Sequence, residues 1–297
     1  MRALRTLFIT ATLLLLGCAE SESQQADSEP ATGASSIVEV VGQGVISTER
    51  NETFPAEDPT DGSLWFSRYD NSFGAQTILF ARRTESGWAP PEVAPFSGTW
   101  GDRAPRFSPG GASIYITSDR PRKRGESPAD MNIWRVSRIG ESWGEPELLE
   151  SPINSEAADI HISVTDQAMW LASSRAGGFG RSDIYRIGPS GDISHLDAPI
   201  NDEKSQPDLW VSADESWMIL VITEASDGYG GDDLYLSRFI EETWTVPANL
   251  GSEINSAEYE YGPSVSVEGQ YLYFTSHRSG TADVYRVSLS FVLDGSE

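Results

Sequence analysis

A repeat of about fifty residues runs through most of this 297-residue chain and restricts the folds that it can adopt. Each copy contains an acidic or amide residue, then a branched aliphatic residue, then an aromatic residue. These triplets begin at Asn132, Asp183, Asp233 and Asp283, at intervals of 51, 50 and 50 residues. A regular period of this length is typical of arrays in which each copy is one small structural unit.

Each copy offers four short strand candidates separated by turn residues. An apolar run that ends in small hydroxyl residues precedes the triplet, as at 114–118 and 272–276, and a tryptophan followed by a proline comes after it, as at Trp143. An Ile-Asn pair then leads into the next copy, at Ile153-Asn154, Ile200-Asn201 and Ile254-Asn255. Four strands are the content of one β-propeller blade.

A more divergent first copy spans about 52–98, which brings the number of copies to five. We therefore predict an all-β fold: a single β-propeller of five four-stranded blades. The last copy lacks a fourth strand after 284–287, whereas 37–41 is an isolated strand ahead of the first copy. We expect this N-terminal strand to pair with the last blade and close the ring, which protects exposed sheet edges. A β-sandwich or an open stack is the alternative, but neither explains the period.

The segments 174–185 (SRAGGFGRSDIY) and 276–285 (SHRSGTADVY) resemble the Ser-Arg-x-Gly-Gly…Asp-Ile-Tyr signature of TolB-like, or WD-like, propeller repeats. The resemblance covers 52–290. It implies a cell-envelope scaffold that recognises proteins, peptides or glycans, and it implies no reaction, because function depends on sites added to a fold.

The N-terminus has the features of an export signal. Arg2 and Arg5 precede a short apolar stretch at 7–16, and Leu15-Leu16-Gly17-Cys18 resembles the lipobox of bacterial lipoproteins. We expect a signal peptide at 1–17, lipid on Cys18, a flexible tether over 18–36, the propeller at 37–290 and a C-terminal tail at 291–297. This organisation predicts a lipid-anchored protein of the bacterial cell envelope, at the outer membrane and facing the periplasm or the cell surface.

The formal charge of −24 limits the partners that the chain can bind. Such an acidic surface repels phosphate backbones, so we expect no nucleic-acid binding and expect membrane attachment through the lipid anchor. Cys18 is the single cysteine, and His161, His195 and His277 show no paired spacing, which argues against a zinc site. We expect no cofactor; the carboxylates of the loop 227–233 (DGYGGDD) leave Ca²⁺ as an alternative.

The strand order places the signature loops at one end of the ring, around the central channel. We expect a mixed-charge rim there, and its residues are Arg120, Arg175, His277 and Arg278 with Glu156, Asp159, Glu203, Glu258 and Glu260. The basic loop 120–124 adds Arg122 and Arg124, which could hold a carboxylate or phosphate. The candidate binding residues are therefore Arg120, Arg122, Arg124, Arg175, Arg278, Asp159 and His161. A structural alternative is that each arginine pairs with an acidic group or with carbonyls of a neighbouring blade.

Three classes of function are consistent with these features. A non-enzymatic module that binds an envelope protein, peptide or glycan is favoured, because the chain has no nucleophile motif, metal-ligand spacing or phosphate loop. A carbohydrate-active enzyme would use two channel carboxylates, with Asp58, Asp159, Asp208 and Glu258 as candidates. A structural envelope protein would assemble through the propeller rim.

Overall fold

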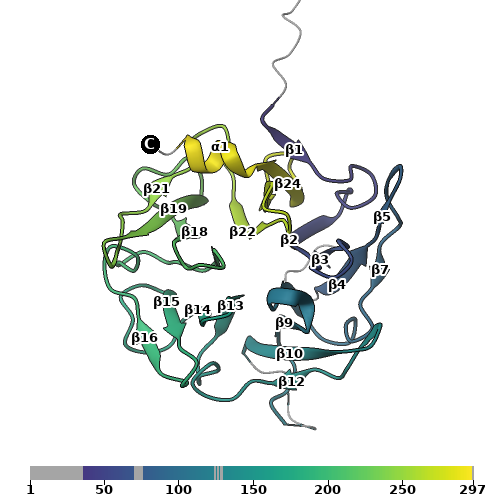
Figure 1. Cartoon of the computed structure of the whole chain (residues 1–297), viewed down its shortest axis with the longest axis horizontal. Helices are drawn as coiled ribbons and strands as arrows, with labels where there is room; N and C mark the ends of the chain where they lie inside the picture. Colours follow the sequence, from purple (N-terminus) through teal and green to yellow (C-terminus); the bar gives the residue numbers. More distant parts are fainter. Residues whose placement is uncertain (1–35, 70–75, 124, 126, 128–129, 296–297) are drawn as a thin grey trace, which may run out of the picture. The chain divides into compact units, whose positions relative to one another are not determined.

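The computed structural model describes residues 36–69, 76–123, 125, 127 and 130–295, and these form five antiparallel sheets around a common centre (Figure 1). The predicted five-bladed propeller is confirmed. The first strand of each blade lies innermost, where it contacts the first strands of neighbouring blades.

The strands of each blade follow one another from the centre outward. Blade 1 consists of β2 (Asn51–Glu57), β3 (Leu64–Tyr69), β4 (Thr77–Ala81) and β7 (Glu92–Val93), and the hairpin β5 (Arg83–Thr84) and β6 (Gly87–Trp88) extends from it. Blade 2 consists of β8 (Asp102–Phe107), β9 (Ser113–Ser118), β10 (Asn132–Ile139) and β12 (Glu147–Leu148), with the 3-10 helix η1 (Pro109–Gly111) after β8 and β11 (Ser142–Trp143) beside β10.

The remaining blades repeat this plan. Blade 3 consists of β13 (Asp159–Val164), β14 (Met169–Ser173), β15 (Asp183–Ile187) and β16 (Ile193–His195). Blade 4 consists of β17 (Leu209–Val211), β18 (Trp217–Thr223), β19 (Asp232–Ile240) and β21 (Ala248–Asn249), with β20 (Thr243–Trp244) beside β19. Blade 5 consists of β22 (Glu260–Val265), β23 (Tyr271–Ser276), β24 (Asp283–Ser288) and the N-terminal strand β1 (Val38–Val40).

The ring closes through β1, as the sequence predicts. β1 pairs antiparallel with β24, and the partners are Val38 with Val287, Glu39 with Arg286, and Val40 with Tyr285. The Glu39 carboxylate also accepts hydrogen bonds from the Arg286 guanidinium at 2.8 and 2.9 Å. The first strand of the domain thus supplies the outermost strand of its last blade.

The hydrophobic core lies between the blades. Strand residues alternate between the two faces of a sheet, and both faces of each blade pack against a neighbouring blade. In β9, for example, Ile114 and Ile116 pack toward blade 1, whereas Tyr115 packs toward blade 3. The described residues form five such clusters, one for each pair of adjacent blades.

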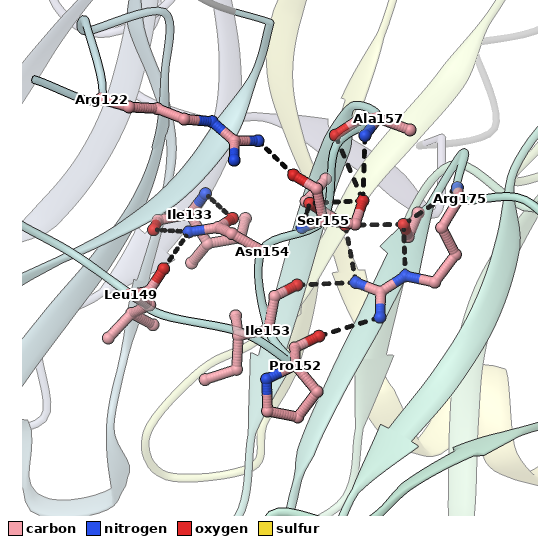
Figure 2. A network of polar contacts seen from close by, with 11 residues as sticks. Arg122, Ile133, Leu149, Pro152, Ile153, Asn154, Ser155, Ala157 and Arg175 are labelled. Carbon is pink, nitrogen blue, oxygen red and sulfur yellow. Dashed lines mark hydrogen bonds and ion pairs between the residues drawn. The ribbon is translucent and has the colours of Figure 1, made fainter.

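The asparagine of the repeated Ile-Asn pair completes the outer edge of the third strand in blades 2, 3 and 4. The Asn154 Oδ1 atom accepts the backbone N–H of Ile133 at 2.8 Å, and Nδ2 donates to the Ile133 carbonyl at 2.8 Å, so the amide pairs as a strand residue would (Figure 2). Asn201 makes the same pair of contacts with Ile184, and Asn255 makes them with Leu234. This pairing gives the repeated asparagine a structural role.

A short helix, α1 (Leu289–Asp294), follows β24. It crosses the boundary that we drew at residue 290 between propeller and tail, because Leu289 and Val292 are buried in the cluster between blades 4 and 5. Among the residues described here, no helix is long and apolar enough to cross a membrane.

Candidate functional site

The signature arginines form a buried contact within their own blade. Arg175 donates to the Asp159 carboxylate at 2.8 Å and to the carbonyl oxygens of Pro152 and Ile153 at 2.9 and 2.7 Å (Figure 2). The Asp159 side chain is fully buried and also accepts hydrogen bonds from Ser173 and Ser155. We call this arrangement the arginine latch, since it ties the second strand of a blade to its first strand and to the loop from the preceding blade.

The latch recurs around the ring with one exception. Its other members are Arg120 with Asp102 and the Phe96 carbonyl, Arg278 with Glu260 and the Ile254 carbonyl, and a variant in blade 1 that joins Arg68 to Glu52. Blade 4 has Ser205 in the place of the carboxylate, and the residues after its second strand, Glu224 and Ala225, include no arginine. The latch therefore accounts for Arg120, Arg175, Arg278 and Asp159 structurally, and their predicted part in binding stays a prediction.

The basic loop contributes one described contact across blades. Arg122 donates to the carbonyl of Ser155 in the loop that leads into blade 3 (Figure 2). Its guanidinium also lies 4.0 Å from the carboxylate of Glu156. Arg124 and Cys18 lie outside the described residues.

The carboxylates in the loop considered for Ca²⁺ accept hydrogen bonds from their own blade. Asp233 accepts the backbone N–H groups of Tyr229 and Gly230, and Asp227 accepts the Tyr235 hydroxyl at 2.9 Å. No group of three or more His, Cys, Asp or Glu side chains placed for a metal occurs in the part of the chain that the structure describes.

The four carboxylates considered for hydrolysis do not converge. Asp58 pairs with Arg138 of blade 2, Asp159 belongs to a latch, and Glu258 is exposed on the loop before β22. Asp208 alone among them lines a cavity at the centre of the ring.

This cavity, which we call the upper cavity, has a volume of about 400 Å³ and opens at the end of the channel where the signature loops lie. All five blades contribute to it, and the lining residues are Phe54, Tyr69, Arg103, Ile160, Pro207, Asp208, Asp232, Tyr259, Tyr261 and His277. Arg103, Ile160 and Tyr261 occupy equivalent positions, each directly after the acidic residue that starts a first strand. Blades 2, 3 and 5 thus present three different side chains at the same point of the channel.

Bulges in the first strands shape this end of the channel. The pairing of β2, β8 and β22 with their second strands is interrupted, and Phe54, Ala104 and Gly262 there have φ values of 54°, 52° and 64°. Residues other than glycine rarely adopt this left-handed backbone conformation, so Phe54 and Ala104 are strained. Backbone strain of this kind is found preferentially at functional sites. A Cβ atom on Gly262 would lie 2.9 Å from the Phe54 ring, so glycine is required there for space as well.

A buried polar cluster forms the floor of the upper cavity. The Asp208 carboxylate lies 2.5 Å from Nδ1 of His161 and accepts the backbone N–H of Gly262 at 3.1 Å. Burial lowers the pKa of His161, so its ring is neutral and donates to Asp208. Burial opposes ionisation of Asp208, but His161, Arg106 and the Gly262 amide outweigh it and lower the pKa of this carboxyl. His161, one of the predicted binding residues, therefore lies behind the cavity and positions Asp208.

The wall from blade 5 is aromatic and polar. Tyr261 and His277 share a hydrogen bond of 3.1 Å between the hydroxyl and Nε2, and Tyr259 packs edge-on against His277 at the exposed rim. Burial lowers the pKa of His277, so its ring is neutral near pH 7. On the adjoining wall from blade 4, burial raises the pKa of Asp232, while a 2.7 Å hydrogen bond from Thr223 opposes that rise.

The upper cavity was largely missed by the sequence analysis, which named Asp208, His277 and, within the loop considered for Ca²⁺, Asp232, but not Arg103, Tyr69 or Tyr261. One signal for this cavity was available in the sequence. At the position after the acidic residue that starts a first strand, the copies carry different residue types although the flanking residues repeat.

Comparisons with known proteins support the fold and leave the activity open. No protein-family model and no curated protein sequence matches the chain. Solved structures that resemble it include a glycoside hydrolase (TM-score 0.52, 10% identity, 82% of this chain and 90% of the other). The endo-arabinase from Bacteroides thetaiotaomicron matches with a TM-score of 0.50 and 11% identity over 84% and 97% of the two chains. The putative TolB from Agrobacterium tumefaciens matches with a TM-score of 0.47 and 19% identity over 77% and 71%. At these identities the likeness concerns the propeller fold alone.

Proposed function

We propose that the protein is a non-enzymatic recognition module of the bacterial cell envelope, anchored by lipid on Cys18, which binds an envelope peptide, protein segment or glycan in the upper cavity. The observation that carries the proposal is the composition of this cavity. Its walls combine aromatic rings with one guanidinium, two carboxylates and an imidazole, which is the pattern of a ligand site with apolar walls and a few orienting polar groups.

The asymmetry of the ring also supports a site at this place. Four blades fix their upper ends with an arginine paired to a buried carboxylate, whereas in blade 4 Thr223 donates to Asp232, which lines the cavity. Asp232 lies next to Tyr259 of blade 5, because these two residues are paired at a parallel bridge, so a ligand at the boundary of blades 4 and 5 would meet a carboxylate beside an aromatic ring.

A capture experiment tests the proposal. The full chain, solubilised in detergent and immobilised, is exposed to solubilised envelope proteins and to purified cell-wall glycans, alongside a Tyr261→Ala variant and an Arg122→Glu variant. We expect one bound species that the Tyr261→Ala variant loses. Loss with Arg122→Glu instead would place the site on the basic loop, and equal capture by all three proteins would contradict the proposal.

A second candidate, a carbohydrate-active enzyme, has one specific observation in its favour. Asp208 and Asp232 line the same cavity, and their pKa values are shifted in opposite directions, which is how paired carboxylates are assigned as ionised group and proton donor. Incubation with cell-wall glycans followed by product analysis tests it. Cleavage that is abolished by Asp232→Asn would replace the binding-module proposal with this one.

A further inference from the structure

A second cavity opens at the opposite end of the channel, and we call it the lower cavity. It has a volume of about 190 Å³ and lies among the ends of the five first strands. Partly buried apolar side chains form most of its wall, namely Phe107, Val164, Trp210 and Val265. Nothing in the proposed function uses this cavity.

Arg106 lies at the inner end of the lower cavity and separates it from the polar cluster under the upper cavity. The residue is 4% exposed. Its Nη1 atom donates to the carbonyl oxygens of Pro55 and Pro105, each at 3.0 Å, and its Nη2 atom donates to the Pro263 carbonyl at 2.9 Å. Three of the five N–H groups of this guanidinium therefore have acceptors, and these acceptors belong to blades 1, 2 and 5.

Two N–H donors of Arg106 have no acceptor among the residues that the structure describes. Its Nε atom is buried and has no hydrogen-bond partner, and Nη2 makes one hydrogen bond although it carries two hydrogens. Two N–H groups on adjacent nitrogens are the fork with which arginine holds both oxygens of a carboxylate.

The charge of Arg106 also lacks a direct partner. Within the described ranges, no carboxylate lies within 4.0 Å of its nitrogens, and Asp208 acts on it only at longer range. Burial lowers the pKa of Arg106 to about 10, so the group is still cationic at neutral pH. A buried cation without a counter-ion is unfavourable, and an anion that reaches it gains a strong charge-assisted hydrogen bond.

Among the described residues, Glu57 is the one acidic side chain that lines the lower cavity, and it is already engaged. Glu57 accepts the backbone N–H of Val267 at 2.8 Å and lies 3.5 Å from Arg83. Ser163 accepts the Val211 N–H through its hydroxyl oxygen, which leaves the hydroxyl hydrogen available to an acceptor in the cavity.

From these contacts we infer that the lower cavity is a binding site for a small amphiphilic carboxylate, with the apolar body against Trp210 and Val164 and the acid group at the Arg106 guanidinium, whose buried Nε–Nη2 edge it engages by a shift of that side chain. This site is independent of the upper cavity, so either proposal can fail without the other.

Saturation-transfer NMR on the full chain tests the inference with three probes of one shape: cyclohexanecarboxylate, cyclohexylmethanol and cyclohexylmethylamine. We expect the carboxylate to bind at least about 10-fold more tightly than the alcohol, and the amine not to bind, because only the acid can use the fork of Arg106. Equal affinity for acid and alcohol, or no binding of the acid at millimolar concentration, would overturn the inference.

Variants locate the site without depending on the stability of an Arg106 substitution. Val164→Trp fills the cavity and should abolish binding, whereas Val246→Trp makes the same change at a position that is 74% exposed and should retain it. Arg106→Gln should remove the preference for the acid over the alcohol. Binding that persists in Val164→Trp would place the probe elsewhere and refute the assignment.

Discussion

Substitution of Arg175 by methionine tests whether the signature arginine stabilises the blade. The change removes the ion pair with a fully buried carboxylate and two hydrogen bonds to carbonyls, and it keeps an apolar side chain of similar length. Loss of one partner from a buried pair costs about 3–5 kcal/mol. Asp159 keeps its contacts with Ser155 and Ser173, so we expect the lower end of that range, about 3 kcal/mol.

The matched control is Arg82→Met. Arg82 also pairs with a carboxylate, Glu92, at 2.5 Å, but the two side chains are 57% and 60% exposed. Exposed pairs contribute about 0–1 kcal/mol.

Both variants are compared with the parent by urea unfolding, monitored by tryptophan fluorescence and circular dichroism, and by thermal melting. For a domain of this size, about 3 kcal/mol corresponds to a fall in Tm of about 6–12 °C. If Arg175→Met and Arg82→Met shift the transition equally, or if Arg175→Met shifts it by less than about 1 kcal/mol, the latch is not the stabilising contact that we describe.

Two further predictions concern ring closure and pH. Deletion of residues up to Val40 should lower Tm and convert part of the protein to dimers on size-exclusion chromatography, because the edge of β24 loses its partner; an unchanged monomer would contradict the role of β1. The His277 ring should titrate below its usual pKa near 6.5 in NMR spectra, since burial disfavours the imidazolium. Because the unfolded chain then binds the proton more tightly than the folded chain, stability should fall as the pH drops below about 6.5, and His277→Phe should reduce that fall.

The fold was predictable because the repeat combines a fixed period with strand and turn residues at fixed offsets. The closing strand was predictable from the same repeat. The last copy lacks a fourth strand, and residues 37–41 are a strand that belongs to no other copy. The role of Asn154 could not be deduced from the repeat alone, because pairing of its amide with Ile133 depends on the distance between two segments that only the folded blade brings together.

The candidate site was less predictable. The sequence placed Arg175 and Asp159 at one end of the ring. It could not show whether these two side chains bind a ligand or pair with one another, since that depends on how deeply they are buried. The upper cavity assembles Arg103 and Tyr261 from copies more than 150 residues apart in the chain, without any local motif. Arg106 gave no signal either, because its importance comes from burial without a carboxylate in direct contact.

The pairing of β1 with β24 also orders events during synthesis. Glu39 and Arg286 are 247 residues apart, so the strand that the ribosome makes first waits for nearly the whole domain before its partner exists. Until then four blades can form in turn, each packing on the one before it, while the first and the last sheet edges stay unpaired. Such edges are where nascent chains associate wrongly or exchange strands with a second copy. A chaperone that shields the N-terminal segment would therefore act until the last contact of the ring can form, and a chain that stalls before residue 283 would have four blades but neither the third strand of blade 5 nor the closure.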